Sequence, residues 1–282
     1  MKKLISIFLV ILFTFVLTAC KEDANTESKT VKVGIRSSEI KTWEFVKEQA
    51  AKEGIDLELV TLTAQVDPNQ VLTEGDIDIN AFQHVAYLET FNSKNGTDIK
   101  PIGTTIIAPM GLYSNKYDSI DDIKDGATIA VPNDPSNWGR ALMLLQEYGL
   151  LTVTDDFDGN GGEDRVKDNP KNLKIVPVDP ATAPRVMDDT DFAIINNGIA
   201  YEAGLLLTDA IIHESETAKP FINVIATNSK DVDNETYKKI VEIYQGEEVT
   251  NFIKEEYKGN FIPVKLSLEE LATWKDAYSS KK

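Results

Sequence analysis

The stretch "DIDINAFQHVAYLETF", residues 76–91, decides the fold class of this chain. Its first part, "DIDIN", alternates polar and apolar residues with the period of a half-buried β-strand. We expect "AFQH", residues 81–84, to begin the helix that follows. A strand that leads directly into a helix is typical of α/β proteins, in which helices connect the strands of a sheet.

Two later segments repeat this junction. In residues 127–149, "ATIAVPNDPSNWGRALMLLQEYG", we predict a strand from Thr128 to Val131, a polar turn, and a helix from about Ser136. Gly149 lies just beyond that helix as a C-terminal stop. In residues 191–204, "DFAIINNGIAYEAG", an apolar strand ends at two asparagines. The repetition predicts an α/β architecture with largely parallel sheets.

The N-terminal part of the globular chain alternates in the same way. Residues 31–38 and 55–62 predict strands, and residues 39–54 predict a helix between them. Trp43 falls in the apolar stripe of this helix, and Gly54 ends it. Aromatic residues at such positions usually pack in a core, so we expect Trp43 to be structural.

Polar residues gather where the predicted strands end. In open α/β sheets the ligand crevice lies beyond the carboxyl ends of the strands, where helix N-termini direct backbone N–H groups. We therefore expect three segments to converge there: Asn80 to His84, Asn133 to Arg140, and Asn196 to Asn197.

Two residues in these segments have a possible chemical role. Arg140 lies early in its helix, where the helix dipole does not favour a cation. A bidentate pair with a carboxylate would explain it, and a surface salt bridge is the alternative. His84 is one of two histidines in the chain. It could contact a ligand or be a buried structural histidine.

The N-terminus resembles a lipoprotein signal. Lys2 and Lys3 precede an apolar run from Leu4 to Leu17, which is too short to span a bilayer. The run closes with "LTAC", which resembles the bacterial lipobox, and an ordinary signal followed by a free thiol is the alternative. We expect residues 1–19 to be the signal peptide, and residues 20–30 to be the lipidated Cys20 and a flexible tether. The protein should be anchored on the extracytoplasmic face of the cell membrane.

Composition excludes several classes of protein. The chain has 282 residues, a formal charge of −17 and a single cysteine. The charge argues against nucleic acid as a partner, and one cysteine allows no disulfide within the chain. "DFDGNGG", residues 156–162, resembles the start of an EF-hand, but Lys167 stands where a bidentate Glu is required. "HESE", residues 213–216, lacks the second His of a zinc motif. We expect no metal, no cofactor and no catalytic residue.

Two blocks carry a family resemblance. "GDIDINAFQH", residues 75–84, and "VPNDPSNWGRALMLL", residues 131–145, look like the NlpA family of lipoproteins, the methionine-binding components of ABC importers. Residues 169–176, 193–196 and 221–227 fit the same family. The resemblance runs from Val31 to about Tyr244.

The resemblance implies a two-lobed, type II-like periplasmic-binding fold. Each lobe should be a mainly parallel sheet flanked by helices, with the ligand in the interlobe cleft. Lobe 1 should comprise residues 31–112 and 226–282, and lobe 2 residues 113–225. The crossovers should fall near Met110 to Ser114 and near Asn223 to Thr227. A monomer should capture methionine, as the L- or the D-enantiomer, and deliver it to an ABC permease and its ATPase.

The resemblance also assigns the site. Arg140 matches the arginine that holds the ligand carboxylate, and Asn196 and Asn223 match asparagines at the polar end of the amino acid. Phe82 and His84 match residues around the thioether, where sulfur–aromatic contacts contribute about 0.3–1.5 kcal/mol each.

Three positions depart from the family pattern. Gln65 stands where a pocket Tyr is usual, Ile199 stands where a Tyr is common, and Trp138 replaces a smaller residue. These changes leave open another amino acid or a short methionine peptide as ligand. A lipid-anchored adhesin and a lipid-anchored enzyme are competing hypotheses for the protein as a whole. The enzyme would have to use Ser136 and His84.

Overall fold

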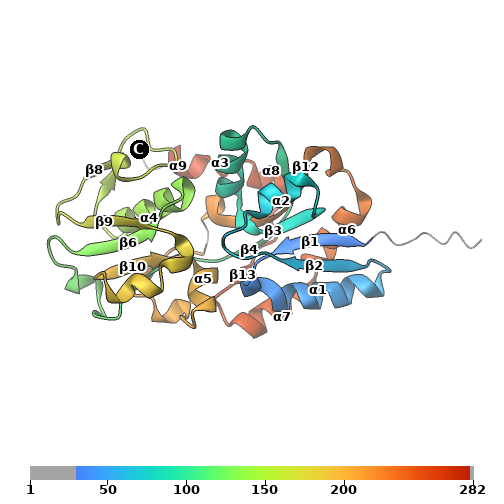
Figure 1. Cartoon of the computed structure of the whole chain (residues 1–282), viewed down its shortest axis with the longest axis horizontal. Helices are drawn as coiled ribbons and strands as arrows, with labels where there is room; N and C mark the ends of the chain where they lie inside the picture. The colour runs from blue at the N-terminus through green and yellow to red at the C-terminus, as the bar shows by residue number, and fades with distance from the viewer. Residues whose placement is uncertain (1–29, 217, 280–282) are drawn as a thin grey trace, which may run out of the picture.

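The computed structural model describes residues 30–216 and 218–279, which form two lobes side by side (Figure 1). The expected signal peptide, Cys20 and nearly all of the tether lie outside the described residues. Within the described ranges, no helix has the length and apolar character needed to cross a membrane.

Lobe 1 is built on a six-stranded sheet in the order β13-β4-β12-β3-β1-β2. Its strands are β1 Val31–Ile35, β2 Leu57–Thr61, β3 Ile79–His84, β4 Ile99–Ile107, β12 Ile222–Asn228 and β13 Ile262–Pro263. The helices that flank it are α1 Ile40–Lys52, α2 Pro68–Glu74, α3 Val85–Asn95, α6 Glu235–Tyr244, α7 Glu247–Tyr257, α8 Leu268–Leu271 and α9 Asp276–Ser279.

Lobe 2 is built on a five-stranded sheet in the order β11-β5-β10-β6-β9. Its strands are β5 Gly111–Tyr113, β6 Thr128–Pro132, β9 Lys174–Val178, β10 Phe192–Ile195 and β11 Ile212–His213, and its helices are α4 Pro135–Glu147 and α5 Asn197–Glu202. β7 Thr152–Val153 pairs with β8 Val166–Asp168 as a separate ribbon. Short 3₁₀ helices are η1 Ser37–Glu39, η2 Ile120–Asp122, η3 Glu163–Arg165, η4 Pro180–Thr182, η5 Arg185–Asp188, η6 Leu207–Asp209, η7 Lys219–Phe221 and η8 Ser229–Asp231.

Both sheets are mixed rather than mainly parallel. In lobe 1, β1 is parallel to β2 and β3, whereas β12 is antiparallel to β3 and β4. In lobe 2, β6 is parallel to β9 and β10, whereas β5 is antiparallel to β10 and β11. The strand that follows each crossover, β5 in lobe 2 and β12 in lobe 1, runs antiparallel to both of its neighbours. The edge strand β13 is also antiparallel to β4. The three-strand parallel core of each lobe agrees with the repeated strand–helix junctions.

The crossovers lie a few residues earlier than expected. The first spans residues 108–110, because β5 already pairs in lobe 2 from Gly111. The second spans residues 214–221, because Ile222 already pairs with Ile107 in lobe 1. The expected boundaries at 112/113 and 225/226 therefore assign the ends of β5 and β12 to the wrong lobe.

The segment "AFQH" belongs to strand β3, so the prediction that it begins a helix is wrong. Ala81 pairs with Ile35 of β1, and His84 pairs with Asn223 of β12. This pairing on both sides holds residues 81–84 extended. The helix begins at Val85, and the Nδ1 atom of His84 caps it by accepting the N–H of Tyr87 at 3.0 Å.

The second junction forms as predicted. The Asp134 side chain accepts the N–H of Asn137 at 3.0 Å, and Pro135 occupies the first helical position. Both features favour the start of a helix at this point. Gly149 follows the helix with a φ of 72°, a conformation that costs glycine little.

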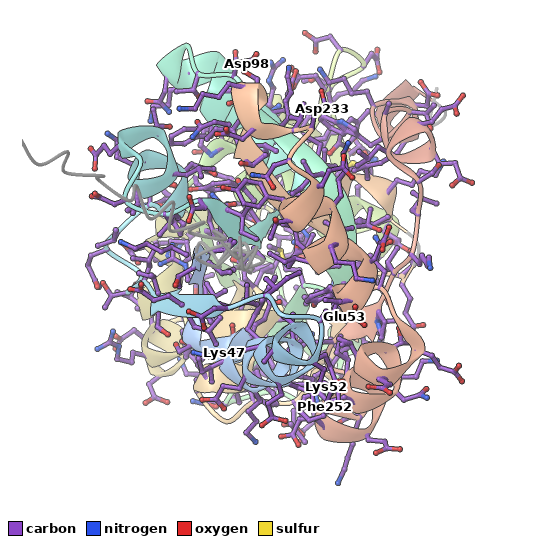
Figure 2. All side chains as sticks on the ribbon, turned by 90° about the vertical axis from the view of Figure 1, so that its right-hand side faces the viewer. Lys47, Lys52, Glu53, Asp98, Asp233 and Phe252 are labelled. Atoms are coloured by element: carbon purple, nitrogen blue, oxygen red, sulfur yellow. The ribbon has the colours of Figure 1, made fainter. Side chains whose placement is uncertain are left out.

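Each lobe has its own apolar core. In lobe 1, α1, α6 and α7 cover one face of the sheet around the fully buried Trp43, and α2, α3 and α8 cover the other. In lobe 2 the largest cluster packs α4 against β6 and β10. The outer end of lobe 1 carries mainly charged side chains, such as Lys47, Glu53 and Asp233, as Figure 2 shows. The fully buried hydrophobic residues of each cluster come from one lobe. The contacts between the lobes are both polar and aromatic: Tyr201 of α5 packs against Tyr257 and Phe261 of lobe 1.

Candidate functional site

A cavity of about 330 Å³ lies between the two lobes. Its walls come from strand ends: Arg36 follows β1, Leu62 follows β2, Asp134 follows β6, Asp179 follows β9 and Asn196 follows β10. The size suits one small molecule. The prediction that polar strand ends converge on one crevice is confirmed.

Five of the predicted site residues line this cavity: Arg140, Asn196, Asn223, His84 and Phe82. Two others lie elsewhere. Gln65 is exposed in the loop after β2, and Trp138 is half-buried on another face of α4. The Trp138 ring lies so close to Gly162 that a Cβ atom there would be 3.1 Å from it. The predicted pocket roles of Gln65 and Trp138 therefore have no support in this geometry.

Asn80 also lies away from the cavity. Its side-chain amide donates to Asn69 at 2.9 Å, and Gln83 donates to the same Asn69 oxygen. This buried cluster of amides fixes the end of β3 against α2, so Asn80 is a structural residue.

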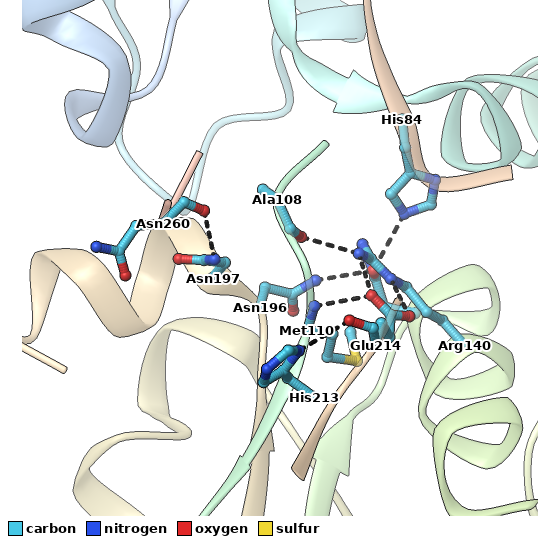
Figure 3. Close-up of polar contacts among 10 residues, drawn as sticks. His84, Ala108, Met110, Arg140, Asn196, Asn197, His213, Glu214 and Asn260 are labelled. Carbon is cyan, nitrogen blue, oxygen red and sulfur yellow. Dashed lines mark hydrogen bonds and ion pairs between the residues drawn. The ribbon is translucent and has the colours of Figure 1, made fainter. Parts of the chain in front are cut away.

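Arg140 forms a buried bidentate ion pair with Glu214 (Figure 3). Nε donates to Oε1 at 2.8 Å and Nη2 donates to Oε2 at 2.6 Å, and both side chains are about 5% exposed or less. Nη2 also donates to the carbonyl of Ala108 in the first crossover, at 2.9 Å. In the described part of the chain, no acceptor contacts Nη1 of Arg140, so this group can donate to a ligand.

Sequence reasoning expected a carboxylate partner for Arg140 but did not find Glu214. The two residues are 74 positions apart, in α4 and just after β11. No spacing or motif links them. The guanidinium also lies over the ring of Phe221, 4.4 Å from its centroid. Such a cation–π contact adds to the stability of a desolvated arginine.

His84 connects the two lobes. Its Nδ1 atom is an acceptor, so Nε2 carries the proton and donates to Oδ1 of Asn137 in lobe 2, at 3.1 Å. Burial, together with the nearby charge of Arg140, lowers the pKa of His84 to about 3. The imidazole is therefore neutral throughout the physiological range. It acts here as a hydrogen-bonding group between the lobes.

The network continues through Asn137 to Asn196. Nδ2 of Asn137 donates to the Asp134 carboxylate, and Oδ1 of Asn137 accepts from Nδ2 of Asn196 at 2.8 Å. With its nitrogen engaged, Asn196 keeps a buried Oδ1 atom without a donor among the described residues. The same is true of Asn197, whose nitrogen donates to the carbonyl of Asn260. Oxygen acceptors at a cavity wall suit a ligand that carries an ammonium group.

Glu39 is a further cavity residue that sequence reasoning missed. It follows Ser38 at the end of η1 and is buried, and no hydrogen bond reaches its carboxyl group from a described residue. Burial raises its pKa to about 8. The strand-end rule could have found it, because Glu39 directly follows the first predicted strand, residues 31–38.

The segment that resembles an EF-hand loop is held by ion pairs. Asp156 contacts Arg165 at 3.3 Å, and Asp155 contacts Lys167 at 2.7 Å. Asn160 accepts from Thr90 of lobe 1 at 2.7 Å. Of the side chains that would hold calcium, Asp156 thus contacts a basic group and Asn160 contacts the opposite lobe, while Asp158 accepts the N–H of Asn160 at 3.0 Å. Within residues 30–216 and 218–279, no group of three or more His, Cys, Asp or Glu residues could hold a metal ion.

Comparison with known proteins identifies the family. A family model described as "NlpA lipoprotein" matches residues 31–265, which is most of the chain. The chain belongs to the NlpA lipoprotein family. The matched range includes both lobes and every residue that lines the cavity.

Relatives match over nearly the whole chain. The D-methionine-binding lipoprotein MetQ of Escherichia coli (strain K12) is 36% identical over 250 residues, covering 87% of this chain and 92% of MetQ. Lipoprotein YhcJ of Bacillus subtilis (strain 168) is 36% identical over 279 residues, covering 97% of each chain. The structure of a nutrient binding protein from Burkholderia cenocepacia bound to methionine has a TM-score of 0.80 and 41% identity, covering 83% of this chain and 99% of that one.

Proposed function

We propose that this protein is a membrane-anchored, extracytoplasmic solute-binding lipoprotein that captures methionine and delivers it to an ABC permease. The observation that carries the proposal is the interlobe cavity, whose lining includes both Arg140, with a free guanidinium N–H, and Asn196, whose Oδ1 atom has no donor among the described residues. The family and the methionine-binding relatives support the choice of ligand.

The polar end of an amino acid needs both kinds of partner. Nη1 of Arg140 can donate to the α-carboxylate, and Oδ1 of Asn196 can accept from the ammonium group. Asn223 pairs in register with His84 and lines the cavity, and no described residue forms a hydrogen bond with its side-chain amide. It can therefore serve either group of the ligand.

The apolar end of methionine would lie against aromatic rings. Phe82 and His84 line the cavity. The centroid of the Tyr87 ring lies 5.8 Å from the centroid of the Phe82 ring and 6.2 Å from that of the His84 ring. Thioether sulfur makes favourable contacts with ring edges. Because His84 is neutral, it adds no charge that would oppose an apolar side chain.

Delivery would use the hinge between the lobes. The two crossovers permit the lobes to open and close about the cavity, and the closed form would be the one that the permease and its ATPase recognise. Lipidation of Cys20 would hold the receptor, as a monomer, at the membrane surface that carries the permease.

The geometry gives less support to an enzyme. Ser136, the candidate nucleophile, donates its hydroxyl to Asp134 at 3.0 Å. Both ring nitrogens of His84 are engaged, with Tyr87 and Asn137, so His84 is not placed to accept a proton from Ser136. This arrangement favours a structural role for Ser136 and a binding role for His84, which lines the cavity.

Methionine should raise the thermal stability of the purified full-length protein. At 100 times its dissociation constant a ligand adds about 2.7 kcal/mol to the free energy of unfolding. Differential scanning fluorimetry with L- and D-methionine would measure this effect, with methioninol as the matched compound that lacks the carboxylate. A melting temperature unchanged by either enantiomer up to millimolar concentration would contradict the proposal.

A further inference from the structure

Arg36 is a second guanidinium at the cavity, and the hydrogen-bond networks of Arg140 and His84 do not include it. It directly follows β1 and is half-buried. Its Nη1 atom donates to the carbonyls of Leu62, at 3.0 Å, and Thr63. Its Cζ atom lies 5.3 Å from the centroid of the Phe82 ring. These contacts hold the side chain in one place at the cavity wall.

The other edge of Arg36 is free. Among the described residues, no acceptor takes a hydrogen bond from its Nε or Nη2 atom. In Arg140 the same Nε/Nη2 edge binds the Glu214 carboxylate with two hydrogen bonds. This edge has the fork geometry that matches a carboxylate. Arg36 therefore lines the cavity with its Nε/Nη2 edge unpaired, whereas the same edge of Arg140 is bound to Glu214.

No carboxylate of the described chain neutralises Arg36 at ion-pair distance. Asp67 and Glu202 attract the guanidinium only from beyond ion-pair distance. Asp67 accepts from the Tyr87 hydroxyl at 2.9 Å, and Glu202 accepts from the Ser37 hydroxyl at 2.7 Å. Arg140, by contrast, forms a direct ion pair with Glu214. Of these two arginines, Arg36 is therefore the one without a carboxylate in direct contact.

We propose that Arg36 forms a second anion-binding subsite. The cavity would then take an amino acid or a dipeptide that carries a carboxylate several bonds away from the α-carbon of its first residue. The inference rests on the proposed function, because it assumes an amino-acid ligand in the same cavity. Arg140, as part of a neutral pair, donates Nη1 to a ligand oxygen, and Arg36 takes the remote carboxylate with its free edge.

Two kinds of ligand share this chemistry. One is a dipeptide with N-terminal methionine, whose peptide carbonyl would face Arg140 and whose terminal carboxylate would face Arg36. The other is an amino acid with an acidic side chain, whose α-carboxylate would face Arg140. In both ligands a carboxylate for Arg36 lies a few bonds away from the carbonyl or carboxylate oxygen that would face Arg140.

Isothermal titration of the full-length protein in detergent would test the subsite. The first pair of ligands is methionyl-glycine and its C-terminal amide, and the second pair is S-carboxymethylcysteine and its neutral carbamoylmethyl counterpart. Methionine is the reference ligand. In the unmodified protein, the charged member of at least one pair should bind roughly 10- to 100-fold more tightly than the neutral member, as expected for a charged hydrogen-bonded pair. The pair that shows the preference identifies the source of the carboxylate.

Arg36→Gln should abolish that preference, measured within the variant as the ratio of its affinities for the charged and the neutral member of the pair. Arg36→Lys should retain part of it, because the charge remains but the fork is lost. The control is Arg185→Gln, which removes an exposed arginine outside the cavity and should leave the preference intact.

The failures are distinguishable. If methionine binds normally but neither pair shows a preference, or if the preference persists in Arg36→Gln, the subsite is wrong and the proposed function stands. If neither methionine nor any of the four other ligands binds to the unmodified protein, the proposed function and the subsite are both wrong.

Discussion

Replacing Arg140 with methionine should lower the free energy of unfolding by roughly 3–5 kcal/mol, the usual cost of removing one partner from a buried ion pair. Glu214 would keep a negative charge that is about 5% exposed, and only the N–H of Met110, at 2.8 Å, would still donate to it. Urea denaturation followed by circular dichroism measures the change. This effect is separate from any loss of ligand affinity.

The double variant Arg140→Met, Glu214→Met should recover most of that stability, because apolar side chains of similar volume can replace a buried pair at little cost. Lys167→Met is the surface control. Lys167 and its partner Asp155, at 2.7 Å, are both exposed, so its removal should cost less than about 1 kcal/mol. A stability loss below about 1 kcal/mol for Arg140→Met alone would show that Glu214 is not desolvated. The folded double variant should also lose methionine binding, because it lacks the Arg140 guanidinium.

Glu39→Gln should stabilise the protein at alkaline pH and have little effect at pH 4 or below. The pKa of the Glu39 carboxyl is about 8 in the folded protein and 4.5 ordinarily. Below pH 4.5 the group is protonated in both the folded and the unfolded chain. As pH rises from 4.5 to 8, only the unfolded chain ionises, so the native state progressively loses stability. Above pH 8 the full penalty, on the order of several kcal/mol, is present.

Thermal unfolding of Glu39→Gln and the parent protein at pH 4.5 and pH 8.5 would measure this difference. The titratable groups that interact with Glu39 are Tyr244 and Tyr257, whose pKa values burial raises, for Tyr257 to about 12, so they do not titrate in this window. His84 is unchanged in the variant, and its effect cancels. Glu48→Gln, an exposed glutamate on α1, is the control. Equal melting temperatures of Glu39→Gln and the parent at pH 8.5 would contradict the assignment.

Strand-end reasoning predicted segments that converge at the cavity, whereas the secondary structure predicted for one of these segments was wrong. Asn137, Arg140 and Asn196 all lie in segments that the sequence predicts to converge, because their strands are parallel neighbours in one sheet. The local pattern of "AFQH" wrongly predicts a helix. The segment is held as a strand by β12, which lies about 140 residues further along the chain. Pairing with so distant a strand leaves no local signal.

The hydrogen-bond partners of the site residues could not be predicted from the sequence. The Arg140–Glu214 pair depends on where β11 ends relative to α4, and no pattern in either segment encodes that distance. Arg36 is a different case. It lies near the carboxyl end of the first predicted strand, residues 31–38, so the strand-end rule would have included it if it had been applied at that junction. The family resemblance gave the roles of Phe82 and His84, which residue patterns alone left open.

The contacts between the lobes have a thermodynamic consequence, because they are of two kinds. Hydrogen bonds join Ser37 to Glu202, Thr90 to Asn160 and Asn197 to the Asn260 carbonyl, and aromatic rings pack between the lobes as Tyr201 on Tyr257 and Phe157 on Tyr278. Burial of apolar surface gives binding its negative heat-capacity change, whereas polar surface contributes with the opposite sign. The two kinds of contact therefore oppose each other in the heat-capacity change of lobe closure. Because closure is common to all ligands of the cavity, differences in the measured value between ligands should report mainly on the ligand and on the rings around it.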